Sequence, residues 1–259
     1  MMKTIMLVPV FMAEDRLLNW KLDIERLNPL PDKIVFVTNN NYDSTLYVLN
    51  SWRIKSDVDI ISVWFKDEPI EDDVAKNCYV PMAHVRELLL AYARNHREYD
   101  YAIFMDTDVH PLNNDFIERI TSWGKDVVGG AYMRRFPQGV CAAAYFWGAV
   151  GYSVLKKVVE PKLTNVKAVG GGCMCLSRRI IDDRRVSFYP LVEGEGVYAE
   201  DFGYCLKAGR HGYSVWLDST EDIFHEDSGN RDKPWMVNMD GSSRKWSYKR
   251  YAISQGYDA

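Results

Sequence analysis

Short apolar runs and longer amphipathic stretches alternate along this chain. An unbroken apolar run of four to eight residues predicts a strand buried on both faces, and apolar residues at helical spacing predict a helix packed against it. By these patterns the first half contains strands at 4–11, 33–38, 58–65 and 101–105, with intervening helices at 13–27, 44–53 and 82–95. Such alternation predicts a parallel sheet with right-handed crossovers.

The second half is less regular. Its patterns predict helices at 116–123 and 197–208 and strands at 126–133, 168–176 and 213–218, while 141–152 is expected to form strands at a sheet edge. No repeat or flexible linker divides the chain. We therefore predict an α/β fold, a single domain over 1–259 with a mostly parallel central sheet flanked by helices.

Composition and charge narrow the class of protein. The chain is 47% hydrophobic and 26% charged, which is ordinary for a globular domain. Its 36 acidic and 32 basic residues argue against nucleic-acid binding, which needs a strongly basic face. Five cysteines with apolar neighbours indicate buried free thiols in a reducing compartment. We expect a cytoplasmic protein.

Membrane contact is a separate question. No signal peptide is evident, and the most apolar window, 140–155, is shorter than a spanning helix. The last segment, 227–259, mixes basic and aromatic residues, so a peripheral contact with anionic lipid stays open. An acidic loop at 67–73 is expected to be solvated.

The strongest chemical signal is a pair of carboxylates at the end of a buried strand. The apolar run 101–105 stops abruptly at Asp106 and Asp108. In open α/β sheets the ligand crevice lies beyond the carboxyl ends of the strands, and unpartnered buried charge is costly. A divalent cation, Mn²⁺ or Mg²⁺, is a suitable partner because it prefers oxygen ligands and bridges to phosphates. Alternatively, one of these aspartates caps the next helix, which Pro111 and Asp115 place close by.

A second acidic pair, Glu200-Asp201, opens the helix predicted at 197–208, and His225 follows the last strand. A positioned carboxylate can accept a proton from a hydroxyl, and a neutral imidazole can bind a metal. Helix capping explains the acidic pair equally simply. Likewise Gly171 and Gly172 permit close approach of a ligand or form a tight turn.

Taken in order, four features resemble the GT-A-fold glycosyltransferases, and most of all their family 2-like nucleotide-sugar transferases. They are the end of the first strand at 8–11, a helix carrying Arg86, the Asp106-Thr107-Asp108 motif and the late Glu200-Asp201 pair. The resemblance covers roughly residues 3–226, by the order of motifs rather than by long matching runs. It implies a nucleotide-binding half at 1–110, an acceptor-binding half at 111–226, and a tail or lid at 227–259.

The resemblance also implies roles. Asp108 would be the main metal ligand, Asp106 a ribose or metal contact, and His225 a third ligand. Asp201 would be the general base, with Glu200 orienting the acceptor. The predicted donor-binding residues are Pro9, Phe11, Asn39, Arg86, Asp106, Thr107, Gly171 and Gly172.

Some of these residues have simpler explanations. Arg86, expected near the start of its helix, is placed there to meet a phosphate or sugar hydroxyl, or else pairs on the surface with Glu87 or Glu98. Asn39 contacts the base or forms a turn, and Thr107 is expected to pack on the opposite face. His225 alone could be structural.

The predicted activity is metal-dependent transfer of one sugar from a UDP- or GDP-sugar to a hydroxyl of a glycan, lipid or small molecule. The Gln-x-x-Arg-Trp signature of processive synthases is absent from the sequence, which favours a single addition. Asp201 as the base favours inversion, whereas a metal-binding His225 is frequent in retaining enzymes. A nucleotidyltransferase and a non-catalytic sugar-binding module are the alternatives. The sequence does not identify the donor sugar, the base of the nucleotide, the acceptor or the oligomeric state.

Overall fold

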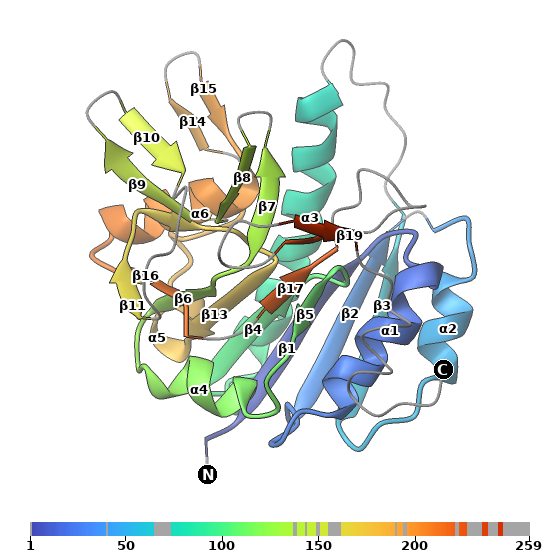
Figure 1. Cartoon of the computed structure of the whole chain (residues 1–259). Coiled ribbons are helices and arrows are strands. Elements are labelled where there is room, and N and C mark those ends of the chain that lie inside the picture. Colours follow the sequence, from blue (N-terminus) through green and yellow to red (C-terminus); the bar gives the residue numbers. More distant parts are fainter. Residues whose placement is uncertain are drawn as a thin grey trace.

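The computed structural model has a central eight-stranded sheet with helices on both faces (Figure 1). It describes residues 2–39, 41–64, 74–136, 139–142, 144–148, 151–154, 162–189, 191–193, 196–220, 223–226, 235–237 and 243–245. For 74–80, 133–136, 139–142, 146–148, 151–154, 192–193, 196–197, 235–237 and 243–245 it describes the backbone alone.

The strand order in the sheet is β11-β16-β6-β13-β4-β1-β2-β3. The bounds are β1 Thr4–Val10, β2 Lys33–Asn39, β3 Asp57–Val63, β4 Tyr101–Met105, β6 Val127–Gly130, β11 Leu163–Asn165, β13 Cys173–Ser177 and β16 Val215–Asp218. β4, β1, β2 and β3 pair in parallel, as do β6 and β16. This confirms the predicted mostly parallel α/β sheet.

The sheet also contains antiparallel strands that the sequence pattern does not reveal. β13 lies between β4 and β6 and runs antiparallel to both, and β11 runs antiparallel to β16. The strand predicted at 168–176 is two strands in the structure, β12 (Ala168–Val169) and β13, separated by the glycines 170–172. This interruption brings the glycines to the carboxyl end of β4.

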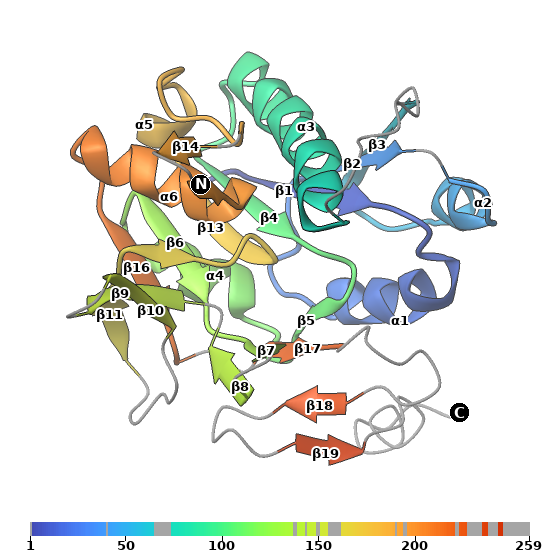
Figure 2. The same cartoon turned by 90° about the horizontal axis from the view of Figure 1, so that it is seen from above.

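Helices cover both faces of the sheet, and Figure 2 shows the two layers from above. The bounds are α1 Glu14–Glu25, α2 Thr45–Ser51, α3 Val74–Asn95, α4 Phe116–Ser122, α5 Arg178–Ile181 and α6 Glu200–Arg210. Buried side chains of α3, α5 and α6 form one core with the sheet, and those of α1, α2 and α4 form the other. In α1, for example, Leu17, Trp20 and Ile24 recur at helical spacing and are fully buried.

Short hairpins and ladders surround the sheet (Figure 1). They consist of β5 Val109–Pro111 with β17 Ile223–His225, β7 Met133–Phe136 with β8 Gly139–Ala142, β9 Ala144–Gly148 with β10 Gly151–Val154, β14 Leu191–Glu193 with β15 Gly196–Tyr198, and β18 Trp235–Val237 with β19 Ser243–Lys245. β12 joins β9 and β10 in a three-stranded sheet. The expected edge strands at 141–152 therefore belong to two small sheets apart from the central one, β8 with β7 and β9 with β10 and β12.

Two helix starts differ from the sequence-based prediction. α3 begins at Val74 rather than at residue 82 and continues through Pro81, so Arg86 lies in the middle of the helix. A proline lacks the backbone N–H, so Pro81 is an unusual residue for the interior of a helix. α6 begins at Glu200 because 196–198 form a strand. The acidic loop at 67–73 lies outside the described residues, as does most of the segment 227–259.

Two further expectations concern the cysteines and the membrane. Cys173, Cys175 and Cys205 are buried, as predicted, and burial raises the pKa of Cys205 to about 12. Within the described ranges, no helix combines the length and the apolar character needed to cross a lipid bilayer.

Candidate active site

The two aspartates of the motif follow β4 directly, at the carboxyl edge of its parallel neighbours. The Asp106 N–H donates to the carbonyl of Gly172 at 2.9 Å, which ties the end of β4 to the glycine segment. The Glu226 N–H donates to the carbonyl of Asp108 at 2.7 Å, and Val109 of β5 pairs with His225 of β17. Two short backbone connections therefore set where the carboxylates lie, and neither aspartate begins a helix.

Arg86 is the centre of the site. Its side chain is only 2% exposed, and its Nη2 donates to both carboxylate oxygens of Asp106, at 2.9 and 3.0 Å. Its Nε donates to Glu200 at 3.3 Å, and its Nη1 to the carbonyl of Gly171 at 2.9 Å. One buried guanidinium thus joins the motif after β4, the first residue of α6 and the glycine segment.

This arrangement corrects the simpler explanation of Arg86. A surface pair with Glu87 or Glu98 is wrong, because Glu87 accepts from Arg94 and Glu98 contacts His96. Proximity to a helix start is also wrong, since α3 begins twelve residues earlier, at Val74. Arg86 instead compensates buried carboxylates, which otherwise would lose their hydration without a partner.

The second acidic pair divides between two environments. Glu200 is 7% exposed, and burial together with the charge of Asp201 raises its pKa to about 7 against the opposing charge of Arg86. Asp201 is half-buried and accepts the N–H of Gly171 at 2.8 Å and that of Phe202 at 2.6 Å. Glu200 is therefore held inside the site, while Asp201 is held at its surface by backbone donors.

Gly171 and Gly172 are required by close packing. A Cβ on Gly171 would lie 2.9 Å from Arg86 Cζ and 3.1 Å from Asp201 Cβ. A Cβ on Gly172 would lie 2.8 Å from the hydroxyl of Tyr132, which accepts the Gly172 N–H at 3.1 Å. Because they have no side chains, these glycines let the backbone pass between the two acidic pairs. The space that a Cβ would need is filled by atoms of Arg86, Asp201 and Tyr132.

Asp108 faces two cationic or polar side chains. His225 Nε2 lies 3.8 Å from its Oδ2, and Arg16 Nη1 lies 3.6 Å from the same oxygen. The His225 ring stacks on Tyr132, with centroids 5.3 Å apart and an angle of 21° between the planes. Arg16 and Tyr132 were not predicted from the sequence. In the sequence Arg16 lies about ninety residues before the motif, so no local pattern indicates its contact with Asp108.

Asp108 and His225 fit a divalent cation as two of its ligands. Asp108 Oδ2 and His225 Nε2 lie 3.8 Å apart, and a carboxylate oxygen and an imidazole nitrogen would be the protein donors that hold such a cation. His225 Nδ1 is buried and has no hydrogen-bond partner within the described residues, so no hydrogen bond holds the ring in another orientation. In contrast to Asp108, Asp106 accepts hydrogen bonds from Arg86 at both of its carboxylate oxygens. The metal contact predicted for Asp106 stays a prediction. In the part of the chain that the structure describes, no three His, Cys, Asp or Glu side chains group around one metal position.

A buried histidine lies directly behind the motif. His110 is 1% exposed and its Nδ1 contacts Asp23 of α1 at 2.8 Å, while its Nε2 lies 3.5 Å from Glu226. Burial alone would lower the pKa of His110, but the contacts with Asp23 and Glu226 outweigh it and raise the pKa to about 9. The sequence assigned this residue no role, and the structure shows that it connects α1 to the β5–β17 ladder.

The remaining predicted donor residues lie along the same edge. Pro9 is buried inside β1, and Thr107 is buried between β4 and β5, as expected of a packing residue. Phe11 follows β1 and is 50% exposed, and Asn39 ends β2 half-buried. The parallel pairing of β1 with β2 ends at Val10 and Thr38, the residues that immediately precede Phe11 and Asn39.

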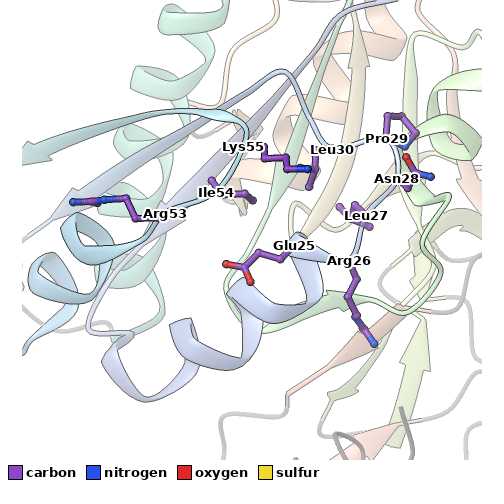
Figure 3. Close-up of a pocket in the computed structure, with 9 residues that line it drawn as sticks. All are labelled: Glu25, Arg26, Leu27, Asn28, Pro29, Leu30, Arg53, Ile54 and Lys55. Atoms are coloured by element: carbon purple, nitrogen blue, oxygen red, sulfur yellow. The ribbon is translucent and has the colours of Figure 1, made fainter. Parts of the chain in front are cut away.

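A cavity of about 850 Å³ lies at the opposite edge of the sheet (Figure 3). Its lining combines the end of α1 and the segment after α2: Glu25, Arg26, Leu27, Asn28, Pro29, Leu30, Arg53, Ile54 and Lys55. The basic side chains of Arg26, Arg53 and Lys55 point in different directions in Figure 3. They do not converge on one point, so this cavity lacks the geometry of an anion site.

Comparison with solved structures identifies the fold. S. aureus TarS 1–349 in complex with UDP-GlcNAc matches with a TM-score of 0.59 and 15% identity, over 88% of this chain and 59% of that one. The same TarS fragment in complex with UDP matches with a TM-score of 0.57 and 16% identity, over 86% and 59%. A197 from STIV matches with a TM-score of 0.55 and 16% identity, over 95% of both chains.

The predicted GT-A-like fold is confirmed by these matches. The chain spans a little under two thirds of the TarS fragment it matches, and at such low identity the likeness concerns the fold. No family model and no curated protein matches the sequence. The activity must therefore be inferred from the site.

Proposed function

We propose that this protein is a glycosyltransferase that moves one sugar from a nucleoside diphosphate sugar to an acceptor hydroxyl. The observation that carries the proposal is the guanidinium of Arg86 between Asp106 and Glu200. It brings the carboxylates expected to bind the donor and those expected to act on the acceptor into one site. The fold shared with S. aureus TarS, whose 1–349 fragment is known in complex with UDP and with UDP-GlcNAc, supports a nucleotide-sugar donor.

The nucleoside end of the donor is assigned to the edge formed by β1, β2 and β3. Phe11, Tyr42 and Trp64 follow these three strands and are 50%, 66% and 64% exposed. The rings of Tyr42 and Trp64 meet edge to face, with centroids 5.4 Å apart. Exposed aromatic faces beside Asn39 suit a nucleobase, which stacks on rings and accepts hydrogen bonds. The diphosphate would then point toward Asp108.

Asp201 is proposed as the general base. Its carboxylate would accept the proton of the acceptor hydroxyl as that oxygen attacks the anomeric carbon of the donor sugar. The bond from the anomeric carbon to the diphosphate oxygen breaks, and its electron pair leaves with the nucleoside diphosphate. Attack opposite to the leaving group inverts the anomeric centre. The N–H groups of Gly171 and Phe202 each donate to one oxygen of the Asp201 carboxylate and so fix its position.

Asp108 and His225 are proposed to hold Mn²⁺ or Mg²⁺, which when bound would neutralise charge on the departing diphosphate. Glu200 is buried against Arg86, and its proposed role is to orient the acceptor. We assign the acceptor to the side formed by residues 111–226. The nature of the acceptor, a glycan, a lipid or a small molecule, is open.

A thermal-shift titration tests the donor class. UDP, GDP, CDP and dTDP would each be added with and without Mn²⁺, to the wild type and to Asp108→Ala. A ligand at 100 times its dissociation constant stabilises the fold by about 2.7 kcal/mol, which raises the midpoint by roughly 5 °C or more for a chain of this size. We expect one diphosphate to stabilise the wild type in a Mn²⁺-dependent manner, and Asp108→Ala to lose the effect.

Other outcomes would identify the alternatives. Stabilisation by a nucleoside triphosphate rather than a diphosphate would favour a nucleotidyltransferase. Sugar binding that is independent of nucleotide and metal would favour a non-catalytic module. If no nucleoside diphosphate shifts the midpoint, with or without Mn²⁺, the proposed function is wrong.

A further inference from the structure

Arg16 contacts the carboxylate expected to bind the metal. Its Nη1 lies 3.6 Å from Asp108 Oδ2, and the two side chains are 27% and 20% exposed. The distance exceeds that of a hydrogen bond, so the contact is a charge pair without fixed geometry. A partly exposed pair of this kind is weak and readily exchanged for another partner.

The position of Arg16 is built into the fold. It occupies the first turn of α1, immediately after a turn in which Met12 has a φ of 43°, a conformation that non-glycine residues rarely adopt. Two side chains, one from the loop after β2 and one from the start of α2, hold this turn. Asn41 accepts the Met12 N–H at 2.7 Å, and Thr45 accepts the Ala13 N–H at 2.8 Å. A strained turn that is held from outside directs the start of α1 toward Asp108.

The two arginines of the site differ in mobility. Arg86 is buried and makes hydrogen bonds to Asp106, Glu200 and Gly171, so it cannot leave without exposing buried charge. Arg16 holds Asp108 through one long contact and keeps a quarter of its side chain exposed. A diphosphate carries more negative charge than one carboxylate and offers several oxygens to a guanidinium. It would therefore compete successfully for Arg16 but not for Arg86.

We propose that Arg16 is an exchangeable counter-ion of Asp108. In the empty site it neutralises Asp108, and when the donor binds it moves to the diphosphate and leaves Asp108 free for the divalent cation. This inference rests on the proposed function, because it takes a nucleoside diphosphate as the ligand. It makes Arg16 a donor-binding residue that also limits metal binding before the donor arrives.

The test measures two affinities in Arg16→Ala. Mn²⁺ alone, followed by electron paramagnetic resonance, should bind about three- to tenfold more tightly to the variant than to the wild type. The variant lacks the guanidinium that competes with Mn²⁺ for Asp108, and that competition is about as strong as one surface ion pair. UDP and GDP, titrated by calorimetry at saturating Mn²⁺, should bind about ten- to a hundredfold more weakly, because a charged hydrogen bond to phosphate is lost. Arg16→Lys keeps the charge and should recover part of the nucleotide affinity.

Opposite changes in the two affinities distinguish exchange from a structural effect. Arg97→Ala, an exposed arginine just after α3, is the matched control and should change neither. If Arg16→Ala weakens both affinities or changes neither while the wild type binds UDP or GDP with Mn²⁺, the exchange is wrong and the proposed function stands. If the wild type binds neither diphosphate at saturating Mn²⁺, both are wrong.

Discussion

Arg86 Nη2 lies 2.9 Å from Asp106 Oδ1 and 3.0 Å from Asp106 Oδ2, across 20 residues of sequence. The same guanidinium reaches Glu200, which is 114 residues away along the chain. It is therefore both a structural link between β4 and α6 and the main source of positive charge behind the acidic groups. Several consequences of this arrangement can be measured.

Replacing Arg86 should strongly destabilise the protein. Arg86→Ala leaves the partly exposed carboxylate of Asp106 and the buried carboxylate of Glu200 without their partner, and breaking a buried ion pair costs about 3–5 kcal/mol. Arg86→Lys should cost less, although an ammonium cannot reproduce the guanidinium geometry. Denaturant unfolding measures both variants, with the exposed Arg97→Ala as the control. If Arg86→Ala lowers the free energy of unfolding by less than about 1 kcal/mol, its effect is close to that of a surface substitution. Such a result would contradict the role given to Arg86.

A pair of glycines offers a matched comparison of packing. In Gly171→Ala the new Cβ would meet Arg86 Cζ at 2.9 Å and must displace the guanidinium, so we expect a loss of about 1–3 kcal/mol in the free energy of unfolding. In Gly209→Ala the Cβ would have nothing within 4 Å inside α6, so we expect a gain of about 0.5–1 kcal/mol. Equal effects at the two positions, measured by denaturant unfolding, would show that the glycine segment is not tightly packed.

Asp201→Asn separates donor binding from transfer. An amide cannot accept a proton from the acceptor, so release of nucleoside diphosphate from the donor should fall by about a hundredfold or more. Donor binding should stay within about threefold, because Asp201 faces Gly171 and Phe202 rather than Asp108. Calorimetry and an assay of diphosphate release measure the two effects, with the exposed Asp115→Asn as the control. Transfer at the wild-type rate would exclude Asp201 as the base.

The ionisation of Glu200 predicts a pH dependence of stability. Its pKa is raised to about 7 in the folded protein, above the ordinary value of 4.5, so the folded state binds more protons between these values. The free energy of unfolding contributed by this group is therefore fully present below pH 4.5 and is lost as the pH rises through 7. Relative to Glu200→Gln, the wild type should lose about 1–3 kcal/mol between pH 4.5 and 8.

Unfolding midpoints of the two proteins at half-unit steps of pH provide the measurement, because subtracting the curves removes the titration of all other groups. A difference curve that is flat, or that rises with pH, would show that Arg86 keeps Glu200 fully ionised in the folded protein.

The order of elements in the first half follows from the sequence because each apolar run is long enough to define a buried strand. The predicted strands 4–11, 33–38 and 101–105 agree with β1, β2 and β4 to within one residue at each end. The strands β5 and β17 were missed, since three residues carry no period that a pattern can show. The start of α3 was missed because Pro81 lies inside the helix.

The amino-acid sequence by itself determined the fold class and the positions of the two acidic pairs, because a buried strand ending in carboxylates is a local pattern. Only the tertiary structure decided which groups these carboxylates meet. Arg86, Arg16 and Tyr132 reach the site from α3, α1 and the end of β6, and β13 enters the sheet between β4 and β6. Hydrophobic patterning records which face of an element is buried. It does not show which other element packs against that face, and this packing decides which charged side chains come together.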